Sequence, residues 1–251
     1  MVQSQENLKS KQSDIKEARE YLRRRLAAEI SMEHYLDRRL IAAAREIVEY
    51  AYSGNIPPTL FSFQYDPFLT YEVERIIRIL ISEIEDYDFE LADSTNRNEG
   101  KTLLSYITRE IDGFTYHDRL TLYSNRFRDE VEQFIKAGLV AGLTKSALES
   151  VIAKSYKTPY KNTIISDVEH RGFTAYPRLL LLTRHTIADA WMHADMEYHL
   201  RRGAIGFITY RGSSFPCDTC ADYAGRFHTF DEPYPPLHNN CKCYAVPIYK
   251  D

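Results

Sequence analysis

The chain has 251 residues, 44% of them hydrophobic, and a formal net charge of −4. With 32 basic and 36 acidic residues, it lacks the clustered excess of positive charge that general binding to nucleic acid or an anionic membrane requires. No apolar run approaches the roughly 20 residues of a membrane-spanning helix, and the first twenty residues lack the apolar core of a secretory signal. We therefore expect no membrane association, and assembly in a reducing cytoplasm, where disulfides are rare.

The first 112 residues are predicted to form an N-terminal helical region, in which loops separate the helices. Apolar residues recur with a period close to 3.6 from Ser13 to Ser53, and Gly54 follows where a helix would end. This stretch is longer than a usual globular helix, so a break near Ser31 is left open. Proline and glycine predict a loop over 54–68.

A second helix is expected to follow that loop, with Thr70 as its N-cap. Its buried face is predicted to carry Val73, Ile76, Ile77, Leu80, Ile81 and Ile84. A polar loop comes next, and a short helix is expected over 102–112.

Three further helices are predicted, over 116–139, 145–155 and 167–202. Gly142 is expected to end the first of these, and Thr144 to cap the second.

After Gly203 the sequence changes in character. Segments 204–212 and 244–249 are rich in β-branched and aromatic residues and are predicted to be strands. The fold class is therefore mainly α, with a helical body of long helices followed by a small C-terminal lobe over 203–251 that contains short β-strands. A lobe of that size buries little apolar surface alone, so a bound metal is the expected source of its stability.

All four cysteines lie in that lobe. Cys217 and Cys220 form a C-x-x-C pair, and His238, Cys241 and Cys243 form a second arm, H-x-x-C-x-C. Two ligands from each arm would complete the tetrahedral site that Zn²⁺ prefers, so we expect four of these five residues to bind a structural zinc ion. Cys241 and Cys243 would point in opposite directions in an ideal strand, which favours His238 with Cys241 unless the chain bends there.

A zinc-dependent nucleic-acid deaminase is one alternative function. That chemistry combines P-C-x-x-C with an upstream H-x-E, whose glutamate transfers protons at a zinc-bound water. Here Cys217 and Cys220 follow Pro216, and His193-Ala194-Asp195 stands upstream, with an aspartate in place of the glutamate. This hypothesis leaves the second arm unexplained. We expect His185, His193 and His199 to lie on the polar face of a helix instead.

An HNH-type nuclease is the other alternative, because His228 and His238 lie within the metal lobe and such an enzyme needs a histidine base beside an open metal site. Nothing in the sequence marks such a base. The basic clusters Arg23–Arg25, Arg38–Arg39 and Arg201–Arg202 are interleaved with acids, which is typical of solvated helix faces.

The order of motifs in the last 110 or so residues resembles the phage head morphogenesis family, the Mu F-like minor head proteins. The resemblance rests on Thr183-Arg184, the small residues Ala188, Ala190 and Ala194, the strand Phe207 to Tyr210, Cys217 and Cys220, Gly225, Pro235-Pro236, and His238 with Cys241-Lys242-Cys243. The sequence departs from the family where Lys242 replaces the usual arginine and Asn239 replaces a frequent proline.

The apolar pattern makes residues 1–112 an N-terminal helical region, which resembles no family and whose role is open. The resemblance implies a Mu F-like domain over 113–251, with helices to about 202. It further implies a non-enzymatic, portal-associated protein of a tailed-phage or prophage head that acts in capsid assembly or in DNA packaging and ejection. Its expected partners are portal and capsid proteins, with packaged DNA as a further candidate and no small-molecule substrate. Its expected location is the virion.

Overall fold

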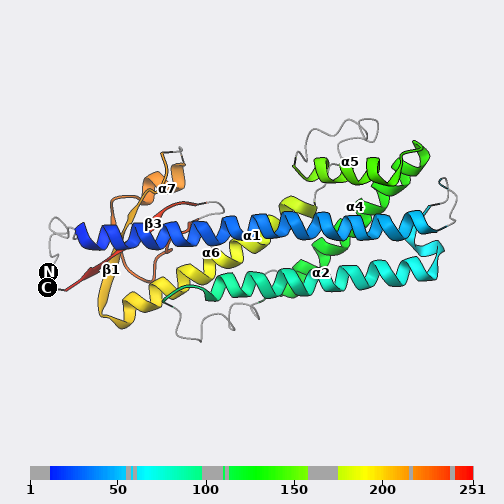
Figure 1. Ribbon diagram of the computed structural model, residues 1–251. Coiled ribbons are helices and arrows are strands. Elements are labelled where there is room, and N and C mark those ends of the chain that lie inside the picture. The colour runs from blue at the N-terminus through cyan, green and yellow to red at the C-terminus, as the bar shows by residue number, and fades with distance from the viewer. Residues whose placement is uncertain are drawn as a thin grey trace. The chain divides into compact units, whose positions relative to one another are not determined.

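The computed structural model describes residues 12–54, 58, 61–97, 110, 113–157, 175–214, 217–237 and 241–250. Its helices are α1 (Gln12–Ser53), η3 (Phe63–Tyr65), α2 (Pro67–Asp93), α4 (Tyr116–Val140), α5 (Lys145–Lys157), α6 (Ala175–Arg201) and α7 (Asp218–Tyr223), and its strands are β1 (Ala204–Tyr210), β2 (Phe227–His228) and β3 (Tyr244–Tyr249) (Figure 1). The predicted fold class is confirmed, since long helices precede a small antiparallel sheet near the C-terminus. Within the described ranges, no helix is both long enough and apolar enough to cross a bilayer.

The chain forms two compact units, each assembled from segments far apart in sequence. Unit 1 combines Met1–Ser31, Phe89–Tyr106 and Arg184–Asp251, and unit 2 combines Met32–Asp88 and Ile107–Thr183. Helices α1, α2 and α6 contribute residues to both. The predicted domain boundary at residues 112 and 113 stays a prediction.

Helix α1 is continuous through Ser31, so the break considered there does not occur. Leu36, Leu40 and Ile47 of its predicted apolar stripe are fully buried. The predicted burial is wrong at Ile30, which is half-exposed, and the charged Arg25 is buried instead.

In unit 2, the predicted buried face of α2 is confirmed, with all six of its apolar residues buried. The predicted cap is wrong. Asp66 Oδ1 accepts the backbone N–H groups of Phe68 and Leu69, whereas Thr70 lies inside the first turn and donates to the Asp66 carbonyl. Pro67 can occupy the first helical position because its missing N–H is not needed there.

The turn between α4 and α5 forms as the sequence predicts. Gly142 has a positive φ of 69°, and Thr144 Oγ1 accepts the Ala147 N–H at 3.3 Å. At the start of α4, Thr115 and Asp118 form a reciprocal capping box.

In unit 1, the sheet has the order β2-β1-β3, with both pairings antiparallel. The two predicted strands are confirmed, the first ending at Tyr210 rather than 212, and β2 is an addition. Successive residues of β3 point to opposite faces of the sheet. Tyr244 and Val246 therefore pack with Ala18 and Leu22 of α1.

On the other face, Ala245 and Phe207 pack with Tyr234 and with partly buried methionines of α6. The small sheet thus obtains its core from parts of α1 and α6 that lie far from it in sequence. The predicted helix over 102–112 falls almost entirely outside the described residues, and so do 167–174 of the predicted last helix.

Candidate metal centre

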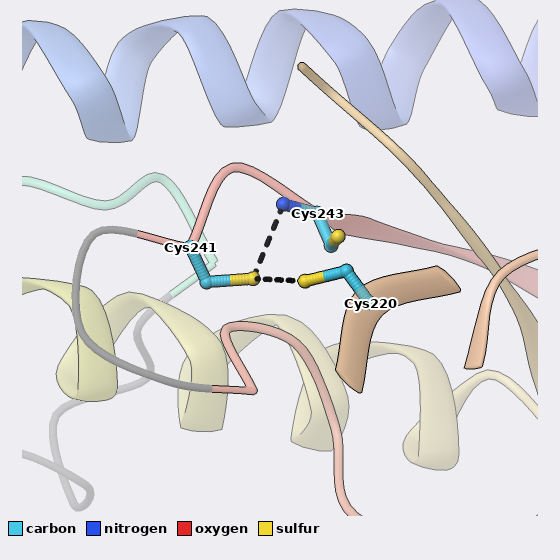
Figure 2. A group of neighbouring side chains, drawn as sticks. All are labelled: Cys220, Cys241 and Cys243. Atoms are coloured by element: carbon cyan, nitrogen blue, oxygen red, sulfur yellow. Dashed lines mark hydrogen bonds between the residues drawn. The ribbon is translucent and has the colours of Figure 1, made fainter. Parts of the chain in front are cut away.

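Two short segments bring three thiols together. Cys217 occupies the N-cap position of α7 and Cys220 lies in its first turn, while Cys241 and Cys243 precede β3. The sulfur atoms of Cys220, Cys241 and Cys243 all lie within 4.8 Å of one another (Figure 2). Each of these three residues is only 4% exposed.

The contacts within this cysteine cluster (Cys220, Cys241 and Cys243) explain how alternate residues converge. Cys220 Sγ and Cys241 Sγ are 3.6 Å apart, and the Cys243 backbone N–H donates to Cys241 Sγ at 3.4 Å. Because β3 begins only at Tyr244, the chain can bend at Cys241–Cys243. Both sulfurs therefore reach one site, and the strand argument for preferring His238 does not hold.

None of the four cysteines forms a disulfide. Cys217 packs against the cysteine cluster and is partly buried. It is the remaining predicted ligand among the described residues. His238 lies outside the described residues.

The three thiols of the cysteine cluster differ in acidity because of their burial and their contacts with one another. Hydrogen bonding by Cys243 lowers the pKa of Cys241 to about 4, whereas burial raises the pKa of Cys220 to about 12. The hydrogen bond to Cys241 and then burial raise the pKa of Cys243 above its usual range. A divalent cation would provide positive charge that favours the thiolate form at all three positions.

Residues outside the two arms position the second arm, and the sequence analysis missed them. Arg25 Nη2 donates to the Cys241 carbonyl at 2.9 Å, and Arg25 also pairs with Glu29 at 3.3 Å. The prediction that the cluster Arg23–Arg25 is solvated is therefore wrong at Arg25, which is 4% exposed. The available signal was its position three residues after Leu22, on the apolar stripe of α1.

Because Gly212 has no side chain, the backbone of the second arm can pass close to it at Lys242. A Cβ atom at this position would overlap the carbonyl oxygen of Lys242, the residue between the two ligand cysteines. Any side chain at 212 would push that segment away.

Asp195, which the deaminase hypothesis would need for proton transfer, is engaged elsewhere. Asp195 forms an ion pair with Arg97 and accepts the Tyr234 hydroxyl at 2.5 Å. Among the described residues, the possible metal-ligand atoms that lie within 4.8 Å of one another belong to the cysteine cluster. Neither His193 nor Asp195 is part of that group. His199, which we expected on a polar helix face, is buried beside Arg97 and Tyr249.

His228, the base considered for a nuclease, has partners at both ring nitrogens. Nε2 contacts the Tyr223 carbonyl at 3.0 Å and Nδ1 contacts Glu232 at 2.9 Å. Its ring is buried and stacks on Tyr223, with ring centroids 4.0 Å apart. These contacts give the imidazole a structural role that joins α7 to β2.

The donor set fits zinc better than a harder cation, because soft thiolates select Zn²⁺ or similar ions and a buried site favours closed, tetrahedral coordination. The arrangement can thus hold one metal ion and tie α7 to the start of β3. In comparisons with known proteins, no family model, no curated protein and no solved structure matches the chain.

Proposed function

We propose that the chain binds one structural Zn²⁺ through four of Cys217, Cys220, His238, Cys241 and Cys243, and that it is a minor protein of a tailed-phage or prophage head. The observation that carries the zinc proposal is the convergence of three buried thiols from two sequence-distant arms. Such a site is structural when protein ligands fill every position, since none is left for water.

The metal would add to the stability that the lobe gains by packing on α1 and α6. Structural zinc contributes on the order of 10 kcal/mol in small metal-binding domains. Here it would fix the Cys241–Cys243 segment against α7, and so fix the register with which β3 pairs with β1. A rigid lobe of this kind suits a protein that docks on partners and performs no chemistry.

The head assignment is supported by the order and spacing of the terminal motifs, from Thr183-Arg184 to Cys241-Lys242-Cys243. It makes the portal and capsid proteins its partners, with packaged DNA as a further candidate, and the virion its location.

Elemental analysis of the purified protein tests the zinc site. We expect one zinc per chain, and loss of that zinc in Cys220→Ser and Cys241→Ser. Parallel Cys217→Ser and His238→Ala variants identify the fourth ligand, because only the true ligand should weaken metal retention against a chelator. Protein without stoichiometric metal, and with unchanged thermal stability in chelator, contradicts the proposal.

Mass spectrometry of purified phage particles tests the head assignment separately. Particles induced from a strain that encodes the chain should contain it in a few copies relative to the major capsid protein. If the chain is expressed during induction but absent from both finished particles and assembly intermediates, the head assignment is wrong, whatever the metal content.

A further inference from the structure

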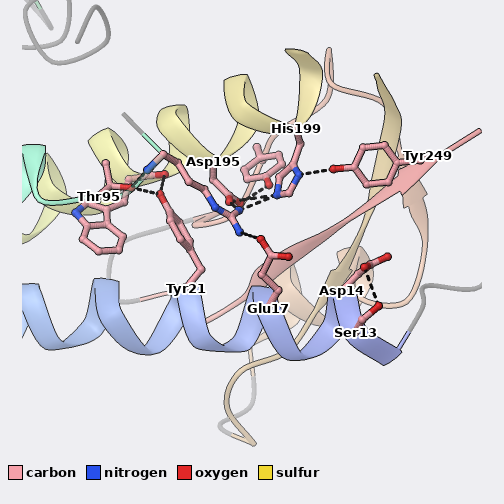
Figure 3. Close-up of polar contacts among 11 residues, drawn as sticks. Ser13, Asp14, Glu17, Tyr21, Thr95, Asp195, His199 and Tyr249 are labelled. Carbon is pink, nitrogen blue, oxygen red and sulfur yellow. Dashed lines mark hydrogen bonds and ion pairs between the residues drawn. The ribbon is translucent and has the colours of Figure 1, made fainter. Parts of the chain in front are cut away.

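Unit 1 contains a polar cavity that is separate from the cysteine cluster. Its volume is about 350 Å³, within the range of small-molecule sites. Its walls come from the start of α1, the residue Arg97, the end of α6 and the strand β3. Figure 3 shows Asp14 and Glu17 on α1, with His199 and Tyr249 on the elements that face them.

Arg97 lines one wall of this cavity and is held in place by contacts with aromatic rings and carboxylates. The Arg97 guanidinium is 4% exposed and lies between the rings of Tyr21 and Tyr198, 4.3 and 4.8 Å from their centroids. It forms ion pairs with Asp195 and with Glu17, the latter at 2.5 Å. Its charge is therefore already balanced by protein carboxylates.

Arg97 also fixes the tautomer of His199. An arginine can only donate, so His199 Nε2, 2.7 Å from Arg97 Nη1, accepts. Burial and then the charge of Arg97 lower the pKa of His199 to about 4, which keeps the ring neutral near pH 7. His199 Nδ1–H therefore donates to the Tyr249 hydroxyl at 2.8 Å, and that hydroxyl keeps its own proton for another acceptor.

Two opposite charges remain at the cavity. Arg202 lines it and stacks on Tyr198, 5.0 Å from the ring centroid, and within the described part of the chain it has no carboxylate at ion-pair distance. Asp14 lines the other side and accepts the Ser13 hydroxyl, and among the described residues it has no cationic partner. Among the described residues, the lining of the cavity thus includes a cation without a carboxylate partner, a hydroxyl donor, a carboxylate without a cationic partner, and the aromatic ring of Tyr198.

We propose that this cavity binds a small zwitterion of the α-amino-acid type. The ligand carboxylate would bind Arg202 and the Tyr249 hydroxyl, its ammonium would bind Asp14, and its side chain would lie against Tyr198 and Pro247. This inference is independent of the zinc site and of the head assignment.

Calorimetric titration of the full-length, metal-replete protein with L-leucine and L-phenylalanine tests the proposal. We expect saturable binding of at least one of them with a Kd of about 1 mM or lower. The N-acetyl derivative lacks the ammonium and the amide derivative lacks the carboxylate, so each should bind about tenfold more weakly than the parent amino acid. Equal binding of an N-acetyl derivative would reduce the site to an anion site and overturn the proposal.

Variants place the binding in this cavity. Arg202→Gln and Asp14→Asn should each weaken binding about tenfold. Arg201→Gln is the matched control in the same turn, because Arg201 pairs with Glu197 and does not line the cavity. No binding to the wild-type protein, or equal effects of the Arg201 and Arg202 variants, would show that Arg202 and Asp14 are only solvated surface charges.

Discussion

Arg97 balances a buried carboxylate of unit 1. It neutralises Asp195, which is 7% exposed, and also contacts His199 and Glu17. Removing one partner of a buried ion pair leaves the other charge buried and unbalanced, which costs about 3–5 kcal/mol. We therefore expect Arg97→Met to lower the free energy of unfolding by about that amount in urea denaturation.

Two comparisons make that expectation specific. Arg201→Met removes an exposed pair with Glu197 and should change stability by less than about 1 kcal/mol. Adding Asp195→Asn to Arg97→Met should restore part of the loss, because the orphaned charge is gone. Equal stability of the Arg97 and Arg201 variants would show that the buried pair contributes nothing.

The buried His199 should make the free energy of unfolding depend on pH. The sign of that dependence follows from its burial, which lowers its pKa. Its pKa falls from the ordinary value of 6.5 to about 4 in the folded protein, so between these pH values the unfolded chain binds more protons. Stability due to this group is thus complete above about pH 6.5 and is lost as the pH falls towards 4. Asp189 acts in the opposite direction, since burial raises its pKa to about 7.

The effects of His199 and Asp189 on stability overlap in pH. The change in the free energy of unfolding must therefore be compared between the wild type and a variant that lacks His199. We expect the wild type to lose on the order of 2–3 kcal/mol more than His199→Gln between pH 7 and pH 4. His34→Gln, at an exposed position on α1, is the control and should follow the wild type. Parallel pH profiles for wild type and His199→Gln would contradict the assignment of a buried neutral imidazole.

At the scale of an element, the segment before β3 depends on Gly212. A Cβ there would overlap the Lys242 carbonyl and approach Leu22 of α1. We expect Gly212→Ala to displace Cys241 and Cys243, and to lower metal affinity at least tenfold in competition with a chromophoric chelator.

The matched control is Gly113→Ala. Gly113 has a φ of 77° but no neighbour within 4 Å of an added Cβ. This variant should cost about 1 kcal/mol of stability and leave metal affinity unchanged. Wild-type metal affinity in Gly212→Ala would show that the close approach does not position the ligands.

Helix α4 offers a second test at this scale. Thr115 Oγ1 accepts the Asp118 N–H at 3.2 Å, and Asp118 accepts the Thr115 N–H at 2.9 Å. Thr115→Ala should therefore lower the free energy of unfolding by about 1 kcal/mol, whereas Thr115→Ser should be close to neutral. Equal losses in thermal denaturation would mean that the hydroxyl is not the stabilising group.

At the scale of the whole molecule, metal removal should act on one unit. Cys220, Cys241 and Cys243 belong to unit 1, and α4 belongs to unit 2. After chelation we expect amide hydrogen exchange to become faster in β1 and β3, and to stay unchanged in α4. Uniform acceleration along the chain, or no change in the strands, would contradict a local structural metal.

The sequence by itself determined the features that depend on local pattern. Apolar periodicity located the buried face of α2 and the long α1, while Gly142 and Thr144 marked the turn between α4 and α5. The C-x-x-C pair and the second arm identified the candidate ligands, because metal-ligand spacing is read along the chain. Residue type also distinguished the strands from the helices, since β-branched and aromatic residues cluster in them.

Tertiary structure decided which residues meet across long separations in sequence. Arg25 and Gly212 support Cys241 and Lys242, and Arg97 reaches His199, through contacts that no periodicity encodes. Charged side chains read along a helix predict solvation, but a partner supplied by a distant segment offsets the cost of burying them. For the same physical reason the two compact units, and the cavity within unit 1, could only be recognised once the chain was folded.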